Sequence, residues 1–284
     1  MQKHLYSRTI LQTIHTPLTI CRSTIGSVEL VSHKVRRARN MSTGAGSLQE
    51  KLRSLHEYSA CDVSDALLKL QKPKPGEIAR GGFLADIEPF ALPQASAANP
   101  NTTNKIIAPA CTVKLVSKQS PPDSVPSAEN AIPKGSHWVD LTESGSVVVI
   151  DQPEGQKCAA VGGMMAARMK IRGVAGCIVG GRVRDITELK SSELPIFALG
   201  RSTVGTSAEA TPYARNVPVS ITGVNVSPGD IIFCDPTEGV VVIPQELLDE
   251  TLSLIPKLVA ADDKVKEAVE GGMTVAEAFK KFRQ

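Results

Sequence analysis

The 284-residue sequence has few aromatic residues and no long apolar run. Aromatic residues make up 4% of it, with a single tryptophan, Trp138. Because proteins that bind single-stranded nucleic acid stack bases on aromatic side chains, this composition argues against that function. A helix that crosses a bilayer needs about 20 consecutive apolar residues, and no stretch approaches this length. The sequence therefore predicts no nucleic-acid partner and no membrane insertion.

Histidine and paired cysteine are also scarce. Three of the five histidines precede residue 40, which leaves His56 and His137, and the six cysteines show no C-x-x-C spacing. A structural zinc site needs four clustered ligands, and a Ser-His-Asp relay needs a histidine beside its nucleophile. We therefore predict neither site, and scattered, unpaired cysteines indicate a reducing compartment.

Basic residues are concentrated at the N-terminus. Residues 1–43 contain seven Lys or Arg and one acid, whereas the remainder contains 25 basic and 28 acidic residues. The body of the protein thus has no excess positive charge, which removes the electrostatic argument for nucleic-acid binding.

Residues 1–43 have the composition of a leader. Residues 1–40 are rich in Arg, Ser and Thr with interleaved Leu and Ile, a pattern typical of a mitochondrial or plastid transit peptide. Met41 is an alternative translation start, because a clear helix signal follows it closely. We predict a mitochondrial protein if residues 1–40 are translated and a cytoplasmic one otherwise. Residues 44–284 are predicted to form a single domain.

Local patterns in this domain predict both helices and strands. Predicted helices cover 47–58, 62–70 and 164–171, with a helical turn over 185–190 and a helical C-terminal region from 245. Predicted strands cover 82–90, 106–116, 147–150, 174–179, 195–199, 217–226, 230–234 and 239–243, and predicted loops cover 91–104 and 118–136. The C-terminal helix is expected to break at Pro256, because proline lacks the N–H that continues a helix. The mixture, without repeats, indicates an α/β fold.

Two glycines, Gly162 and Gly163, precede the predicted helix over 164–171. Free backbone N–H groups at a helix start, together with the helix dipole, favour a bound anion such as a carboxylate. Glycines at this place also allow a helix to pack closely on a strand, and for an isolated pair this structural role is the commoner one. The pair alone leaves both roles open.

Arg184 and Asp185 follow a buried strand and a glycine-rich turn, where α/β folds place ligand-binding groups. Asp offers a hard oxygen ligand for Mg²⁺ or Mn²⁺, and Arg can bind a substrate carboxylate with two hydrogen bonds. In a loop, such a pair is more often a solvated surface pair. Spacing does not choose between the two.

Six motifs, in order along the chain, resemble the RraA-like family. They are Cys61-Asp-Val-Ser-Asp-Ala-Leu, Pro109-Ala-Cys-Thr-Val-Lys, Gly162-Gly-Met-Met-Ala, Gly181-Arg-Val-Arg-Asp-Ile-Thr-Glu-Leu, Pro195-Ile-Phe-Ala, and Ser227-Pro-Gly-Asp-Ile-Ile-Phe with the following Glu-Gly-Val-Val-Val-Ile-Pro. The similarity runs from about Leu48 to the C-terminus and is greatest to the eukaryotic, largely fungal branch. This family includes 4-hydroxy-4-methyl-2-oxoglutarate aldolases that also decarboxylate oxaloacetate.

The resemblance implies a β/β/α swivelling-type sandwich with N- and C-terminal helices, assembled as a homotrimer or homohexamer with the active site between subunits. It implies that Asp185 binds the divalent metal, Mg²⁺ or Mn²⁺, and that Arg184 contacts a 2-oxo acid. Backbone amides at the start of the 164–171 helix would hold the substrate carboxylate; the residues are Gly163, Met164, Met165, Ala166 and Ala167. An acid from the neighbouring subunit's C-terminal region also takes part in the family, and the candidates are Asp262, Asp263 and Glu267.

We therefore predict a metal-dependent lyase, a class II-type pyruvate aldolase or oxaloacetate decarboxylase, that stabilises an enolate by charge at the keto oxygen. Two departures bear on activity, because relatives commonly carry acids where Gly163 and Gly180 stand. These acids could orient metal-bound water. Their absence favours an alternative, a non-catalytic RraA-like regulator that binds another protein, whereas Arg184 and Asp185 oppose it.

Three other functions fit less well. A phosphotransfer domain would need a phosphorylated loop histidine, and His137 is the single candidate; we predict instead that His137 and Trp138 pack against the sheet. A methyltransferase would need a strand followed by a glycine-rich cofactor loop, which is missing. A Schiff-base aldolase would need a desolvated lysine in the cleft, and Lys170 and Lys190 are predicted on helix surfaces.

Overall fold

The computed structural model describes residues 47–73, 75–76, 78–93 and 105–283. The predicted leader, residues 1–43, and residues 94–104 of the predicted loop lie outside the described residues. Within the described part, none of the helices combines the length and the apolar character that crossing a membrane requires.

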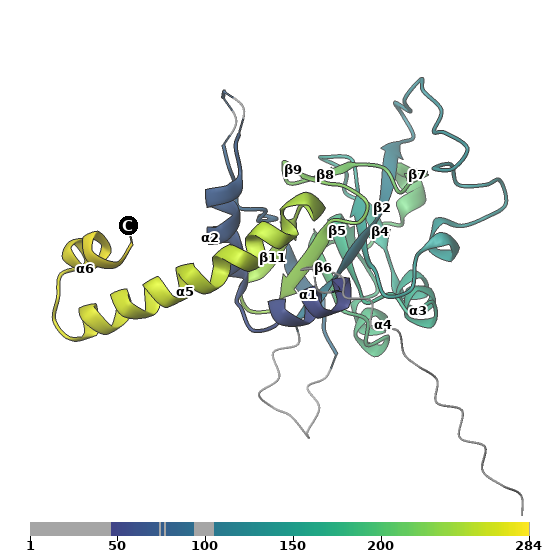
Figure 1. Ribbon diagram of the computed structural model, residues 1–284. Helices are drawn as coiled ribbons and strands as arrows, with labels where there is room; N and C mark the ends of the chain where they lie inside the picture. The colour runs from purple at the N-terminus through teal and green to yellow at the C-terminus, as the bar shows by residue number, and fades with distance from the viewer. Residues whose placement is uncertain (1–46, 74, 77, 94–104, 284) are drawn as a thin grey trace, which may run out of the picture. The chain divides into compact units, whose positions relative to one another are not determined.

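Helices flank a central sheet (Figure 1). The helices are α1 (Leu48–Leu55), α2 (Ala60–Leu70), α3 (Gly163–Ile171), α4 (Ile186–Ser191), α5 (Leu248–Glu270) and α6 (Val275–Phe282), with 3-10 turns η1 (Trp138–Leu141), η2 (Thr206–Ala208) and η3 (Gln245–Leu247). The strands are β1 (Glu88–Ala91), β2 (Ile106–Ser117), β3 (Val147–Asp151), β4 (Ala159–Val161), β5 (Gly176–Val183), β6 (Ile196–Arg201), β7 (Ala210–Arg215), β8 (Val219–Ile221), β9 (Val224–Val226), β10 (Ile231–Asp235) and β11 (Gly239–Ile243).

In the described residues, nine strands form one curled sheet in the order β1-β6-β5-β3-β2-β10-β11, with β4 on β5 and β7 on β2. β8 and β9 form a separate hairpin. The centre of the sheet is parallel, because β5 pairs in this way with β3, β4 and β6, and β3 with β2. The carboxyl ends of these strands therefore meet at one edge of the sheet. The predicted α/β class is confirmed.

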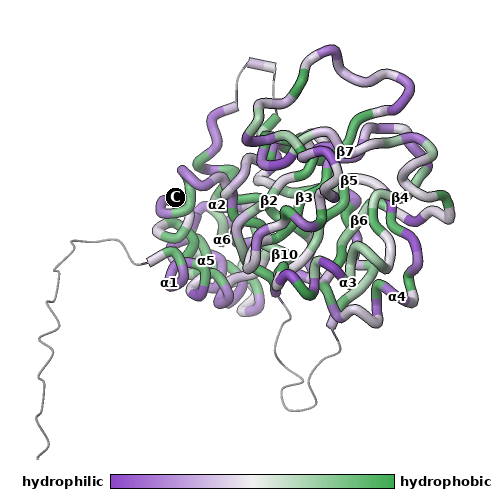
Figure 2. Tube along the Cα trace, turned by 90° about the vertical axis from the view of Figure 1, so that its right-hand side faces the viewer, coloured by the Kyte–Doolittle hydropathy of each residue, from purple (hydrophilic) through white to green (hydrophobic). Residues whose placement is uncertain are grey.

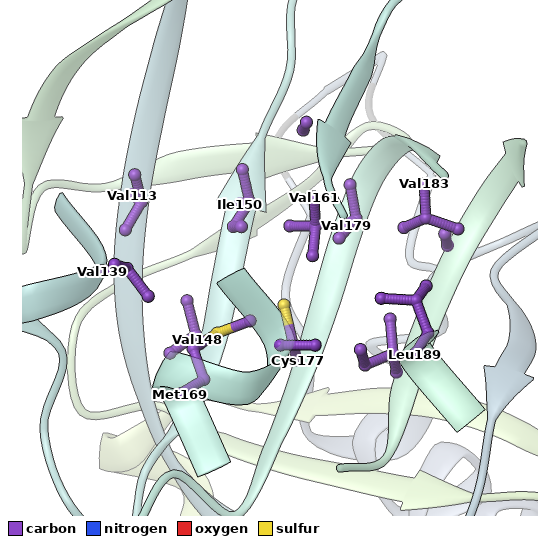
Figure 3. Close-up of a cluster of buried hydrophobic side chains, with 14 of the residues drawn as sticks. Val113, Val139, Val148, Ile150, Val161, Met169, Cys177, Val179, Val183 and Leu189 are labelled. Carbon is purple, nitrogen blue, oxygen red and sulfur yellow. The ribbon is translucent and has the colours of Figure 1, made fainter. Parts of the chain in front are cut away.

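The sheet is apolar on both faces, as the green interior of Figure 2 shows. On β3, Val148 and Ile150 belong to a cluster with α3, α4 and η1, whereas Val147 and Val149 belong to a cluster with the β8–β9 hairpin. Figure 3 shows the first cluster, where Met169 of α3 lies over Val148 and Cys177. Burial on both faces explains the continuous apolar runs of the parallel strands.

A third cluster fixes α1, α2 and α5 to the outer face of β10 and β11. Two of these helices begin with a capping box or are linked to one: Ser47 and Glu50 cap α1, and Thr274 and Glu277 cap α6, which follows α5. α2 begins earlier than predicted because Ser59 and Asp62 form a third capping box.

The predicted helix break at Pro256 is wrong, because α5 runs through this residue without interruption. Proline removes one helical hydrogen bond and crowds the preceding turn. The neighbouring residue Ile255 is fully buried in the third cluster. We infer that this packing outweighs the local cost of the proline.

Strand boundaries differ from the prediction in several places. The strand predicted over 82–90 is reduced to β1, and the strand predicted over 217–226 is the β8–β9 hairpin, because Thr222 and Gly223 both have positive φ, at 47° and 80°. Two positive φ values in sequence make a tight hairpin turn. β5 continues to Val183, which carries Arg184 and Asp185 to the edge of the sheet. β4 and β7 were not predicted.

Candidate functional site

A cavity of about 300 Å³ opens at the carboxyl edge of the parallel strands. It is bounded by the ends of β2, β4 and β5, the start of α3, and the turns η1 and η2. The lining residues are Lys118, His137, Trp138, Ala159, Ala160, Gly162, Met164, Met165, Arg184, Asp185, Thr206, Ser207, Ala210, Thr211 and Pro212. The structure thus brings the predicted Arg184 and Asp185 together with the predicted start of the 164–171 helix.

Asp185 occupies the N-cap position of α4 but makes no capping hydrogen bond there. Its φ is 58°, the left-handed region that few non-glycine residues adopt, although Asp tolerates it better than most. The carboxylate Oδ2 instead accepts the Gly163 N–H at 3.3 Å, across the cavity edge. The side chain is 40% exposed. Its carboxylate therefore lies between α3 and the cavity and does not cap its own helix.

Arg184 lies beside Asp185, with Nε 3.4 Å from Oδ2. Its backbone N–H donates to the Val161 carbonyl, which fixes the end of β5 against β4. Two glycines leave room for its side chain: a Cβ on Gly162 would lie 3.3 Å from Nε, and a Cβ on Gly205 would lie 3.0 Å from Nη1. The guanidinium therefore extends from the start of α3 towards η2.

The start of α3 is shaped by the same glycine pair. A Cβ on Gly162 would lie 2.6 Å from Asp185 Oδ2, so this position must lack a side chain for the carboxylate to stand where it does. The Met165 and Ala166 N–H groups both donate to the Gly162 carbonyl, at 3.1 Å each. In the described structure the Met164 N–H has no such acceptor, and it is the amide available to an anion.

The five residues predicted to hold the substrate carboxylate are divided by the structure. Met164 and Met165 line the cavity, and Gly163 contributes its N–H to Asp185. Ala166 is fully buried in the core below, and Ala167 lines a separate hollow with Glu188. Successive residues of a helix point about 100° apart. The side chains of this stretch therefore have different surroundings, and it stays a prediction that the backbone amides hold a substrate carboxylate.

Gly163 and Gly180, where the resemblance implies acids in relatives, each lie close to a side chain of another element. A Cβ on Gly163 would collide with Glu188 of α4. A Cβ on Gly180 would lie 2.7 Å from Ile221, in the cluster on the opposite face of the sheet from α3. In this chain a side chain at 180 would therefore point away from the cavity.

Glu209 positions two walls of the cavity. Its carboxylate accepts the backbone N–H groups of Lys157 and Cys158, at 2.7 Å each, and thus ties the segment before β4 to the residue that follows η2. These hydrogen bonds favour the charged form and lower the pKa of Glu209. Thr206 of η2 adds a bond from its hydroxyl to the Ala159 carbonyl, at 2.6 Å.

Several cavity residues were missed by the sequence analysis. Lys118, Thr206, Ser207 and Thr211 come from loops and from the unpredicted β7 region, where no local pattern marks them. Trp138 is buried in the first cluster, as predicted, whereas His137 is exposed at the cavity. Its Nδ1 accepts the Val139 N–H at 3.3 Å, so it also caps η1.

One lysine that the sequence analysis did not consider lies at the cavity. Lys170 and Lys190 are exposed, as predicted, but Lys118 lines the cavity. Lys118 is also exposed, so it lacks the desolvation that makes lysine a Schiff-base nucleophile.

The donor set suits a hard cation that keeps much of its own water. No group of three or more His, Cys, Asp or Glu residues that could enclose a metal occurs in the described part of the chain. Asp185 is the single acid among the described cavity residues. Mg²⁺ is commonly bound through one or two carboxylates, with water and substrate oxygens completing its shell. Asp185 therefore fits Mg²⁺ or Mn²⁺ and does not fit a zinc cage.

The C-terminal acids predicted to act on a neighbouring subunit lie on α5. Asp262 accepts a hydrogen bond from Arg283 Nε at 2.5 Å, and Glu267 lines a hollow between α5 and α6. Neither they nor Asp263 line the cavity of their own chain.

Comparison with known proteins agrees with this fold. Residues 60–242 match the family model described as RraA-like, Aldolase/RraA. Protein DlpA of Legionella pneumophila subsp. pneumophila is 29% identical over 174 residues, which are 61% of this chain but 27% of DlpA, so the chain spans about a quarter of that relative. A protein of Halalkalibacterium halodurans named "Putative 4-hydroxy-4-methyl-2-oxoglutarate aldolase" is 31% identical over 179 residues, 63% of this chain and 79% of that protein.

Two solved structures share the fold. An uncharacterized protein from Pseudomonas syringae pv. tomato superposes with a TM-score of 0.60 at 24% identity, covering 81% of this chain and 96% of the other. Streptomyces coelicolor RraAS2, described as an unusual member of the RNase ES inhibitor RraA protein family, gives 0.56 at 24% identity, covering 79% and 96%. At this identity the likeness concerns the fold alone. From the matched segment, which includes α3, β5 and the Arg184-Asp185 pair, we conclude that this chain belongs to the RraA-like family.

Proposed function

We propose that this protein is a divalent-metal-dependent lyase that breaks the C3–C4 bond of small 2-oxo acids and releases pyruvate. The candidate reactions are retro-aldol cleavage of 4-hydroxy-4-methyl-2-oxoglutarate and decarboxylation of oxaloacetate. The observation that carries the proposal is the convergence of the Asp185 carboxylate, the Arg184 guanidinium and the start of α3 on one cavity. The aldolase name of the Halalkalibacterium halodurans relative supports it.

The 2-oxo acid end of the substrate would bind between Arg184 and α3. The Met164 N–H lies in the first turn of α3. The positive end of the helix dipole is at this turn, and it favours a bound carboxylate. Arg184 supplies several N–H donors in a plane, so it can hold a carboxylate oxygen and the 2-oxo oxygen together. Arg184 directly follows β5 and Met164 belongs to α3, so both groups are oriented before substrate arrives.

Asp185 would hold Mg²⁺ or Mn²⁺, with water and substrate oxygens completing the ligand set. When bound, the cation would supply positive charge at the 2-oxo oxygen, where negative charge develops as the C3–C4 bond breaks. Arg184 stabilises the same developing charge, and one well-placed donor of this kind contributes on the order of 3 kcal/mol. Both candidate reactions leave the electron pair on C3, conjugated to this oxygen. The same arrangement therefore serves both.

We further propose that the chain assembles as a homotrimer or homohexamer and that a C-terminal acid of one subunit reaches the cavity of the next. Because Asp262 is paired with Arg283, Asp263 and Glu267 are the better candidates. α6 exposes Val275 and Phe279, which are 52% and 41% accessible, and this supports a subunit contact near α6.

The experiment measures pyruvate release from both substrates with added Mg²⁺, with and without a chelator, and with an enzyme-free blank for the spontaneous decay of oxaloacetate. We expect release that the chelator abolishes and that Asp185→Asn lowers by about 100-fold or more, since Asn removes the charge and keeps the shape. Thr187→Ala, an exposed change on α4, is the matched control. Release that survives the chelator or Asp185→Asn would contradict the metal-dependent proposal.

A second candidate is a non-catalytic regulator that binds another protein. Two observations favour it. Asp185 is the single acid among the described cavity residues, and Gly163 adds no second carboxylate that could orient metal-bound water. Absence of pyruvate release by the wild-type protein from either substrate would support this candidate over the lyase.

A further inference from the structure

A second cation stands at the cavity, away from the Arg184-Asp185 pair. Lys118 follows the last residue of β2, and its backbone N–H donates to the Glu209 carbonyl at 2.9 Å. Its Nζ donates to the Ser207 carbonyl of η2 at 2.5 Å. The ammonium group is thus placed on η2 by one hydrogen bond, and the backbone of Lys118 is tied to Glu209, the residue that follows η2.

The two cations flank the same short turn. Arg184 Nη1 reaches Gly205, and Lys118 Nζ reaches Ser207. Because consecutive Cα atoms are about 3.8 Å apart, residues 205 and 207 lie within about 7.6 Å of each other. Both Arg184 and Lys118 also line the same cavity of about 300 Å³.

The ammonium group of Lys118 has capacity for a ligand. It has three N–H donors, of which the Ser207 carbonyl takes one. Among the ion pairs of the described residues, none includes Lys118. The hydroxyl-bearing residues Ser207 and Thr211 line the cavity with it. This end of the cavity is therefore suited to an anion with several acceptor oxygens.

We propose that Lys118 binds the distal carboxylate of a 2-oxo dicarboxylate whose 2-oxo acid end lies at Arg184 and Asp185. The inference rests on the proposed function, because it takes the 2-oxo acid end to bind there. A chain of three or four C–C bonds separates the two carboxyl carbons by about 4–5 Å. A ligand of this length fits inside the cavity of about 300 Å³ that Arg184 and Lys118 both line. Lys118 is then a specificity-determining residue that favours dicarboxylates over pyruvate-like monocarboxylates.

Binding experiments can test this residue separately from catalysis. Pyruvate and 2-oxoglutarate share the 2-oxo acid end, and 2-oxoglutarate adds a distal carboxylate without the 4-hydroxyl group that retro-aldol cleavage needs. Titration calorimetry in the presence of Mg²⁺ would compare both ligands on the wild-type protein, Lys118→Met and Lys118→Arg. Lys134→Met, an exposed lysine that does not line the cavity, is the control.

We expect the wild-type protein to bind 2-oxoglutarate more tightly than pyruvate. Lys118→Met should weaken 2-oxoglutarate binding by about 10- to 100-fold, the range for loss of a hydrogen bond to a charged group. Pyruvate binding should change less than about 2-fold, and Lys118→Arg should recover most of the affinity for 2-oxoglutarate. Lys134→Met should bind both ligands as the wild-type protein does.

Several results would overturn the proposal. The first is that Lys118→Met binds 2-oxoglutarate as tightly as the wild-type protein does. The second is that Lys118→Met loses affinity for both ligands equally, which is the result expected if Lys118 only links β2 to η2. Binding of neither ligand by the wild-type protein also counts against it. The lyase proposal fails by a different readout, absence of chelator-sensitive pyruvate release, so the two failures are distinguishable.

Discussion

Gly162 and Gly205 give the cavity its shape by leaving space for charged side chains that come from β5. The Asp185 carboxylate occupies the space of a missing Cβ on Gly162, and the tip of Arg184 approaches Gly205. The two positions differ in what would have to move. Asp185 is short and held by its backbone, whereas the end of Arg184 can turn away.

We predict that Gly162→Ala displaces the Asp185 carboxylate and lowers kcat/KM for pyruvate release on the order of 100-fold, since a misplacement of about 1 Å can cost this much. Gly205→Ala should have a smaller effect, carried mainly by KM. Steady-state kinetics check both variants, with circular dichroism to show that each is folded. Equal effects of the two substitutions would contradict this account of the glycines.

Single residues were predictable where a local pattern marks them. Arg184 and Asp185 follow a strand and a glycine-rich turn, and the family motif adds their roles. Lys118 follows a strand as well, but it gains its place at the cavity through the Ser207 carbonyl, 89 residues away. A contact of this kind has no signature in the sequence. The cavity end that carries Arg184 and Asp185 was therefore predictable, and the end that carries Lys118 was not.

At the scale of elements, the residues that were easiest to predict form their hydrogen bonds locally. The capping boxes of α1 and α6 are complete within four residues. β4 has three residues and β7 contains Pro212, so neither shows the alternation of a strand. Both exist because a longer strand, β5 or β2, offers its edge. Pro256 is the reverse case, where tertiary packing of α5 overrides a local helix breaker.

The link between β4 and η2 gives a prediction on pH. Hydrogen bonds lower the pKa of Glu209, so its stabilisation is complete above the ordinary Glu pKa of about 4.3 and is lost as the pH falls through the lower, folded-state pKa. We expect Glu209→Gln to lower Tm at pH 6, and the difference from the wild-type protein to shrink as the pH falls below about 4.3. Thermal melts from pH 3 to 6 measure it. A difference that grows on acidification would show the opposite sign and refute the assignment.

At the scale of the whole molecule, the three hydrophobic clusters share strands. Alternate residues of β3 enter the first and second clusters, and alternate residues of β10 enter the second and third. The third cluster lies with α1, α2 and α5, and the first lies under the cavity. Because each shared strand is packed on both faces, loss of one cluster removes support from the next.

This sharing predicts cooperative unfolding. Phe233→Ala empties a fully buried position of the third cluster and should lower the free energy of unfolding by about 3–5 kcal/mol. Trp138, the single tryptophan, belongs to the first cluster and reports on it by fluorescence. In urea, Phe233→Ala should shift the unfolding midpoint measured by Trp138 fluorescence together with the midpoint measured by far-UV circular dichroism. Lys257→Ala, on the exposed face of α5, should leave both midpoints unchanged. A shift of the dichroism midpoint alone would show that the clusters unfold separately.

The left-handed backbone at Asp185 restricts which amino acids can follow Arg184 in any protein built on this frame. Gly, Asn and Asp adopt this geometry most easily, while a branched side chain is disfavoured. Of these three, Asp alone brings a negative charge. Under the proposed function, Asn or Gly here would remove the charge and keep the backbone, so we expect members of this fold that lack lyase activity to carry Asn or Gly at this position.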